Sequence, residues 1–227
     1  AYHIGFVLGP CINASGRLDT AARSLALLNA KTKEEAARLA GDLTALNQSR
    51  KALTEKGKEE AIRIIETTEL KNDRVLVVYL PDCHESLAGI IAGRIREKYH
   101  RPAFVLTGGE ASAKGSGRSI ESYSMYEELV KCADLMIQFG GHPMAAGLSI
   151  EEKNIEEFRR RLNVNCTLTD EELRPKIVID VPMPVSYITK ELVEQISLLE
   201  PFGKGNTKPV FAQKNLRVLD YSIIGKN

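Results

Sequence analysis

Two short segments combine glycines with side chains that bind anions. The first is Gly115-Ser116-Gly117-Arg118-Ser119. In an extended strand, Ser116 and Arg118 point to one face of the sheet, while Gly117 and Ser119 point to the other. A hydroxyl and a guanidinium on one face can hold the same phosphate group, because the guanidinium donates charge-assisted hydrogen bonds. The alternative is an edge strand with a solvated arginine.

The second segment is Gly140-Gly141-His142, which follows an apolar stretch over residues 135–139. Two glycines allow a sharp reversal of the chain with positive φ, which would bring His142 to the edge of a cleft. A protonated imidazole there would stabilise negative charge on phosphoryl oxygens, whereas a neutral one would donate a single hydrogen bond. A lone histidine is more often structural, so both interpretations stay open.

A third block carries an amide, a hydroxyl and a guanidinium close to the start of the chain. Asn13, Ser15, Gly16 and Arg17 are expected to precede a helix, where free backbone N–H groups favour an anion. A capping loop is the alternative.

His84 stands at a predicted corner between a strand and a helix over residues 86–99. Ser86 or Glu85 would cap this helix, and His84 would then point outward. A purely structural corner is slightly favoured over a contact with substrate.

Four blocks follow one another in the order of one known family: Ile12-Asn13-Ala14-Ser15-Gly16-Arg17-Leu18, then the Ser116–Arg118 segment, then the Gly-Gly-His segment, then Leu199-Glu200-Pro201-Phe202-Gly203-Lys204-Gly205-Asn206. From about Gly9 onward, the chain resembles the RecJ single-stranded-DNA exonucleases of the DHH phosphoesterase superfamily. The resemblance implies a catalytic role for His142 opposite the metal ions. It also implies a set of substrate-binding residues: Asn13, Arg17, His84, Ser116, Gly117, Arg118, Ser119, Gly140 and Gly141.

The family takes its metal ions from Asp- and His-rich motifs, including Asp-His-His, and none of these occurs in the sequence. The resemblance therefore implies the C-terminal part of a 5′-to-3′ exonuclease of DNA repair and recombination, which grips the 5′ phosphate end. Such enzymes use two Mn²⁺ or Mg²⁺ ions. This part would hold no metal and would be inactive alone. Ser15 replaces the commoner alanine, and Thr207 replaces the usual proline.

Two other functions stay open. A DHH-type phosphodiesterase acting on short oligonucleotides or cyclic dinucleotides carries a similar Gly-Gly-His, but usually lacks a following barrel. A non-catalytic nucleic-acid-binding module would be either a degenerate nuclease relative or an RNA-binding accessory domain. The presence of both Arg118 and His142 argues against degeneracy.

The composition is that of a folded protein, with 43% hydrophobic and 27% charged residues among 227. A net charge of +1 means that nucleic-acid binding must come from local clusters.

The chain has no long apolar run and no signal pattern, so a cytoplasmic protein without membrane contact is expected. The resemblance adds single-stranded DNA and single-strand-binding protein as partners. Basic candidates for the path of the strand, each with a solvated helix face as the alternative, are Arg94, Arg96, Lys98, Arg101 and Lys114.

The elements that position these residues form an α/β fold. Thr32 and Glu35 make a capping-box pattern before a long helix over residues 33–69, which we expect to act as a strut. Residues 71–163 alternate buried strands and helices, which predicts a mixed-sheet, DHH-associated α/β domain. Residues 164–227 carry short strands at 176–181, 210–212 and 216–221 and a helix at 191–199, as in part of an OB-like barrel.

Two remaining segments have less regular patterns. Residues 1–10 are predicted to be a strand or loop at the end of the catalytic domain, which would occupy residues 1–30, and residues 31–70 would be the connecting helix. The loop around Phe202 suits base stacking or packing of the barrel.

Overall fold

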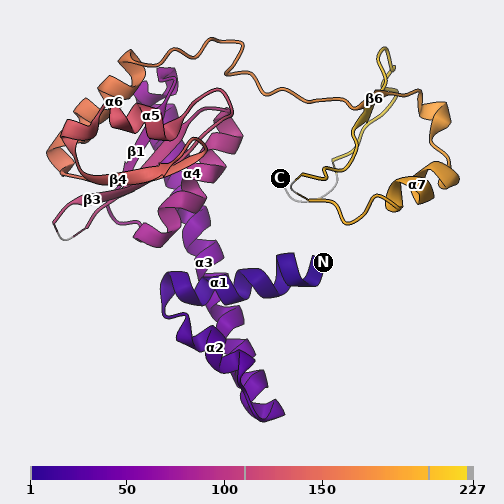
Figure 1. Cartoon of the computed structure of the whole chain (residues 1–227), viewed down its shortest axis with the longest axis horizontal. Coiled ribbons are helices and arrows are strands. Elements are labelled where there is room, and N and C mark those ends of the chain that lie inside the picture. Colours follow the sequence, from indigo (N-terminus) through magenta and orange to yellow (C-terminus); the bar gives the residue numbers. More distant parts are fainter. Residues whose placement is uncertain (1, 110, 204, 224–227) are drawn as a thin grey trace. The chain divides into compact units, whose positions relative to one another are not determined.

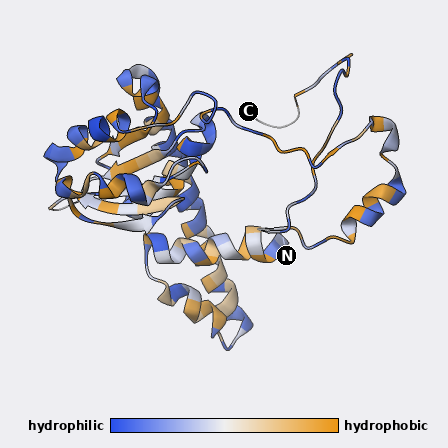
Figure 2. Cartoon of the chain, turned by 45° about the horizontal axis from the view of Figure 1, so that its top comes forward, coloured by the Kyte–Doolittle hydropathy of each residue, from blue (hydrophilic) through white to orange (hydrophobic). Residues whose placement is uncertain are grey.

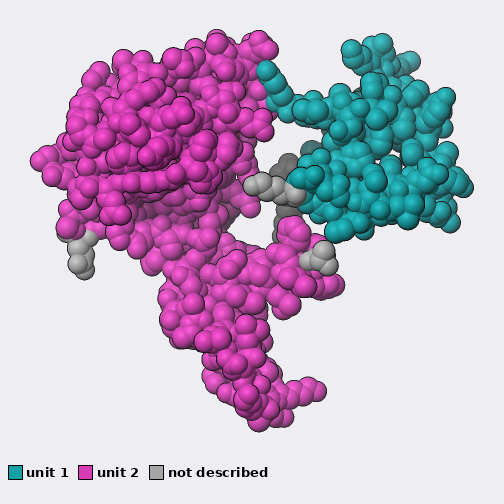
Figure 3. All heavy atoms as spheres, in the orientation of Figure 1, with its two compact units in different colours: residues 1, 176–227 teal, residues 2–175 magenta. Residues whose placement is uncertain are grey.

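The structure, a computed structural model, describes the chain except residues 1, 110, 204 and 224–227. It separates into two compact units, one over residues 2–175 and one over residues 176–227 (Figure 3). No helix in the described part of the chain has both the length and the apolarity needed to cross a bilayer.

The chain begins with helices. A π-helix, η1 (His3–Leu8), runs into α1 (Gly9–Leu18), and α2 (Ala22–Leu28) follows. The predicted strand or loop over residues 1–10 is therefore wrong for the described residues. A short apolar run does not distinguish a strand from a helix. Pro10 fits the first turn of α1 because the N–H that proline lacks has no helical partner there.

A continuous 35-residue helix, α3 (Lys33–Thr67), confirms the prediction of a long helix (Figure 1). Thr32 caps it by accepting a hydrogen bond from the N–H of Glu35 at 3.1 Å. Both α1 and α2 pack against α3, which then contacts α4 and β1. A Cβ atom on Gly57 would lie 2.6 Å from Cδ1 of Ile91, so this glycine allows α3 and α4 to approach closely.

The α/β domain contains a five-stranded mixed sheet in the order β1-β2-β3-β5-β4. Strands β1 and β2 are parallel, and every other neighbouring pair is antiparallel. The strands are β1 (Leu76–Leu80), β2 (Ala103–Thr107), β3 (Ala113–Arg118), β4 (Met136–His142) and β5 (Ala145–Ile150). The predicted mixed sheet is confirmed.

Helices cover both faces of the sheet, and Figure 2 shows its hydrophobic strands between them. On one face, α3 and α4 (Glu85–Tyr99) bury a core that includes Val78, Ile91 and Val105. On the other face, α5 (Met125–Val130) and α6 (Ile155–Val164) close a second core, in which Phe104 and Phe158 meet edge to face. Short 3-10 helices are η2 (Glu69–Asn72), η3 (Ala133–Leu135), η4 (Glu152–Asn154) and η5 (Val185–Tyr187).

One local prediction in this domain is wrong, the reversal of the chain at Gly140 and Gly141. Helix α5 ends at Val130, and η3 then leads directly into β4. The chain does not reverse at the two glycines, because β4 continues through them to His142. The reversal falls instead at Pro143 and Met144, between paired residues His142 and Ala145.

The second unit contains α7 (Lys190–Ser197) and one parallel pair of two-residue strands, β6 (Val181–Pro182) and β7 (Phe211–Ala212). The strand predicted over residues 176–181 forms only at its last residue, and no strand forms over residues 216–221. A strand needs a paired neighbour for its backbone hydrogen bonds, and one short pair gives few of them. None of the described residues of this unit is buried.

Candidate functional site

Arg118 and His142 lie in one row across three strands. The register pairs Arg118 of β3 with Ala145 of β5, and Ala145 with His142 of β4. Directly opposite residues of antiparallel neighbours point to the same face. The two side chains therefore start from the same face of the sheet, with backbones about 10 Å apart at the usual strand spacing.

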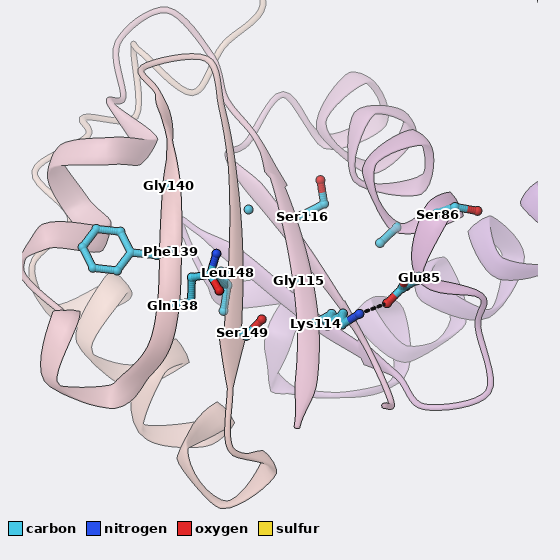
Figure 4. Close-up of a pocket in the computed structure, with 12 residues that line it drawn as sticks. Glu85, Ser86, Lys114, Gly115, Ser116, Gln138, Phe139, Gly140, Leu148 and Ser149 are labelled. Atoms are coloured by element: carbon cyan, nitrogen blue, oxygen red, sulfur yellow. Dashed lines mark ion pairs between the residues drawn. The ribbon is translucent and has the colours of Figure 1, made fainter. Parts of the chain in front are cut away.

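Two further rows continue this face and line a hollow of about 620 Å³ beside the first turn of α4 (Figure 4). Figure 4 also shows that Phe139, although at the rim, points away from the hollow. The register aligns Ser116 with Gly147 and Gly140, and Lys114 with Ser149 and Gln138.

Gly140 and Gly147 keep the hollow open. A Cβ atom on Gly140 would meet nothing within 4 Å, and one on Gly147 would meet only the carbonyl oxygen of Gly115 at 3.8 Å. Neither glycine has the positive φ that would disfavour a side chain. Packing and backbone conformation therefore leave both positions free, and the space above them is available to a ligand.

Three other predicted site residues are used by the fold. A Cβ atom on Gly117 would lie 2.6 Å from Cε1 of Phe104, on the face opposite the hollow. Ser119 is buried, and its hydroxyl donates to the carbonyl of Tyr123 at 2.6 Å. Gly141 has a φ of 155°, and a Cβ there would lie 2.4 Å from the carbonyl oxygen of Ala145. The structure brings neither the Cα face of Gly117 nor the Ser119 side chain to the hollow.

The Arg118 guanidinium lies between β3 and α4. Its Nη1 donates to Ser116 Oγ at 3.1 Å and to the Gly117 carbonyl at 2.7 Å. A Cβ atom on Gly89 of α4 would be 2.7 Å from its Nη2. Burial is the main cause that lowers the pKa of Arg118, and nearby Arg17 lowers it further. No carboxylate among the described residues forms an ion pair with it.

Arg17 is tied to the same end of α4. Its Nη1 donates to the Ser86 carbonyl at 2.8 Å, and the Ser86 hydroxyl donates to the Arg17 carbonyl at 2.9 Å. Ser86 and Gly89 are three residues apart, so they lie on one face of α4 about one turn apart. Two guanidiniums from distant parts of the chain therefore meet beside the first turns of α4.

The block precedes α2, as expected, but it does not form a helix start, because Asn13, Ser15, Gly16 and Arg17 all lie inside α1. Ser15 is fully buried, and its hydroxyl bonds to Ser24 at 2.7 Å. The burial of Ser15 stabilises residues 13–17 as the interior of a helix. These residues therefore offer an anion no free helix N-terminus. Asn13 is exposed one turn before Arg17 and shares its side of α1.

His84 is itself the N-cap of α4, so the expected cap by Ser86 or Glu85 is wrong. The imidazole Nδ1 replaces the usual side-chain oxygen: it accepts from the Ser86 N–H at 3.3 Å and bonds the Ser86 hydroxyl at 2.8 Å. His84 lines a second cavity, of about 560 Å³, beside α3. It is not among the residues that line the hollow.

The basic residues predicted to line the path of the strand make contacts within the protein, which favours the structural alternative. Arg94 and Arg96 pair with Glu97, Lys98 lies over the Tyr99 ring, Arg101 donates to two backbone carbonyls, and Lys114 pairs with Glu85. In the loop proposed for base stacking, Lys204 lies outside the described residues.

Arg50 of α3 lies close to Arg17, and the sequence analysis did not predict it as a site residue. Its Nε and Nη2 donate to Asn47 Oδ1 at 3.2 and 3.0 Å. Burial lowers its pKa most, followed by the nearby charge of Arg17. One signal was available: Asn47 stands four residues after Leu43, so a polar residue occupies the buried face of the helix.

The fold and the site define an α/β domain whose mixed sheet, joined to a long helix, carries arginines beside an open hollow. Residues 72–166 match the DHHA1 domain, and residues 179–227 match the RecJ OB domain. The chain belongs to the RecJ family.

Curated relatives and solved structures agree. The chain is 36% identical to the single-stranded-DNA-specific exonucleases RecJ of Bacillus subtilis and Escherichia coli, over 99% and 100% of its length. It spans 29% and 41% of those proteins. The crystal structure of RecJ from Thermus thermophilus in complex with Mg²⁺ matches with a TM-score of 0.79 and 29% identity, covering 92% of this chain and 32% of that one.

Proposed function

We propose that the chain is the substrate-binding part of a metal-dependent single-stranded-DNA exonuclease, and that it holds the 5′ phosphate end of the strand. The observation that carries the proposal is the meeting of Arg17 and Arg118 beside Ser116, with no carboxylate paired to Arg118 among the described residues. The names of the curated relatives support the substrate. The RecJ OB match supports an exonuclease over a short-oligonucleotide phosphodiesterase.

Two guanidiniums suit the end of a strand better than its interior. A terminal phosphate monoester carries a charge of about −1.5 to −2 near neutral pH, whereas an internal diester carries only one negative charge. Arg118 and Arg17 would donate to the terminal oxygens together with the Ser116 hydroxyl. The attached nucleoside would occupy the hollow over Gly140 and Gly147.

His142 would approach the substrate from the β4 side of the same face. Its Nδ1 accepts a hydrogen bond from the Met144 N–H at 3.3 Å, which leaves Nε2 to face a ligand. We assign it the stabilisation of charge on phosphoryl oxygens. His84 and Asn13 would contact the strand outside this phosphate site.

The whole protein would use Mn²⁺ or Mg²⁺, the ions in the titles of the related Thermus structures. The described residues of this chain do not fit such an ion, since no three His, Cys, Asp or Glu side chains among them are grouped to bind one. Bound ions would activate water for phosphodiester hydrolysis. The residues of this chain would bind and orient the strand end, and His142 would stabilise charge on the phosphoryl oxygens.

The resemblance extends the proposal to a role in DNA repair and recombination in the cytoplasm, with single-strand-binding protein as a partner. Residues 1–30 would end the catalytic domain, 31–70 would connect it, 71–163 would bind the strand end, and 164–227 would form part of the OB-fold.

The test compares binding of single-stranded oligonucleotides that carry a 5′-phosphate or a 5′-hydroxyl. The 227-residue chain should prefer the phosphate, and Arg118→Ala should lose that preference. A hydrogen bond to a charged group contributes about 1.5–3 kcal/mol, which corresponds to a loss of about 10- to 150-fold. Arg160→Ala is the matched control, because Arg160 of α6 is exposed, is paired with Glu157 and belongs to the helix on the opposite face of the sheet.

Equal affinity of the unmodified chain for both oligonucleotides would contradict end recognition. A retained preference in Arg118→Ala would remove Arg118 from the site. With Mn²⁺ added, the chain alone should release no nucleotides, and release that depends on the metal would overturn its assignment as a binding part.

A further inference from the structure

We infer that Arg50 is a further substrate-binding residue, which contacts the phosphodiester next to the terminal phosphate. The inference rests on the proposed function. It extends the grip from one phosphate to two, so the preferred ligand becomes a strand of at least two nucleotides.

A buried amide holds Arg50 in place. Asn47 is only 7% exposed, and its Nδ2 donates to Sγ of Cys11 in α1 at 3.5 Å. Its Oδ1 accepts two bonds from Arg50, through Nε and Nη2. Both ends of the amide are therefore engaged, and the guanidinium keeps three of its five N–H donors for another partner.

The path of α3 places Arg50 beside the first turns of α4. One turn after Arg50, Leu53 lines the cavity that also contains His84, the N-cap of α4. Arg17 bonds to Ser86, two residues beyond that cap. Arg50 and Arg17 therefore approach the same helix end from two different helices.

The charge of Arg17 acts on both of the other arginines. Arg17 lowers the pKa of Arg50 and also that of Arg118, in each case after burial. Neither Arg50 nor Arg118 is among the causes that shift the other. Arg17 is therefore close to both of the other arginines, and a group of three neighbouring guanidiniums suits consecutive phosphates of a strand.

Three other cations of α3 are neutralised within the helix. Arg38 pairs with Asp42, Lys58 with Glu55, and Arg63 with Glu60, all at spacings of three or four residues. Arg50 instead has a neutral amide at this spacing, so its full charge is retained beside that of Arg17. Adjacent like charges destabilise a fold unless an anion joins them, and a nucleic acid backbone supplies such anions.

The test measures the affinity of the 227-residue chain for a 5′-phosphorylated single strand at several salt concentrations. Arg50→Ala and Arg50→Gln should each reduce the steepness of the plot of log affinity against log salt by about 0.7, the effect of one lost phosphate contact on a single strand. Glutamine can still donate to Asn47, so the second variant removes the charge and keeps a local hydrogen bond. Lys51→Ala, a neighbouring exposed lysine, is the control and should leave the slope unchanged.

A second ligand separates this inference from the proposed function. Both Arg50 variants should bind a 5′-phosphorylated mononucleotide as the unmodified chain does, and should keep the preference for a 5′-phosphate, because those properties depend on Arg118. An unchanged salt slope in both variants would overturn the inference and leave the proposed function intact. Loss of mononucleotide binding would also overturn it, since Arg50 would then act at the terminal phosphate. Thermal unfolding of each variant shows that its fold is retained.

Discussion

Substituting two glycines on opposite faces of the sheet tests whether the hollow is a ligand site. Gly147→Val places a branched side chain in the middle row, between Ser116 and Gly140. The first atom of that side chain would come no closer than 3.8 Å to its neighbours. Glycine within a strand costs about 0.5–1 kcal/mol relative to alanine, so stability should hold or rise slightly.

Gly117→Ala is the comparison on the other face. Its Cβ atom would lie 2.6 Å from Cε1 of Phe104 and 2.8 Å from Sδ of Met125, both fully buried. Excess volume in a packed core costs about 1–3 kcal/mol. For a chain of this size, each kcal/mol lowers Tm by about 2–4 °C. The variant should therefore melt several degrees lower, and while folded it should bind DNA normally.

Both variants are measured by thermal unfolding and by binding of a 5′-phosphorylated oligonucleotide. In Gly147→Val the nucleoside would meet the new side chain, and a clash of about 1.4 kcal/mol or more weakens binding at least tenfold. Unchanged binding would refute the argument that the hollow holds the nucleoside. A large drop in the Tm of Gly147→Val would refute the argument that its face of the sheet is open.

Two further predictions concern stability. Asn163→Ala should destabilise the α/β domain by about 2–4 kcal/mol in urea unfolding, because Oδ1 of Asn163 accepts from the backbone N–H groups of Arg74 and Val75, and these would lose their partner. Burial, followed by a hydrogen bond with Glu152, raises the pKa of Tyr79 to about 12 from 10.0. This contribution to the free energy of unfolding is complete below pH 10 and is lost as pH rises toward 12. Because Tyr79→Phe has no phenol to ionise, its urea midpoint should fall less between pH 10 and pH 12 than that of the unmodified chain.

The elements that the sequence predicts well are those with one dominant pattern. The long helix has a capping box, no proline and a repeating leucine spacing, and it forms as expected as α3. Strands β1 and β2 are continuous apolar runs, which is typical of strands covered on both faces. In both cases local preference and tertiary burial act in the same direction.

The elements that the sequence does not predict depend on distant partners. Strand β5 begins Ala145-Ala146-Gly147, residues with little preference for strands, and it exists because β3 and β4 pair with both of its edges. The opposite error occurs over residues 176–180 and 216–221. Their β-branched residues favour strands, but the described part of the second unit pairs only β6 with β7. Propensity without a paired neighbour does not produce a strand.

Gly89 shows why the site itself could be predicted only in part. Within a helical pattern, a glycine destabilises the helix by up to about 1 kcal/mol relative to alanine, and the sequence shows no compensating interaction. In the structure a Cβ atom at this position would lie 2.7 Å from Nη2 of Arg118 and 2.9 Å from Oγ of Ser116. The missing side chain is therefore what lets this pair lie against α4, one turn from the carbonyl that holds Arg17. Spacing along β3 was enough to join Ser116 with Arg118, but the helix that brings them to Arg17 and Arg50 is defined only by tertiary packing.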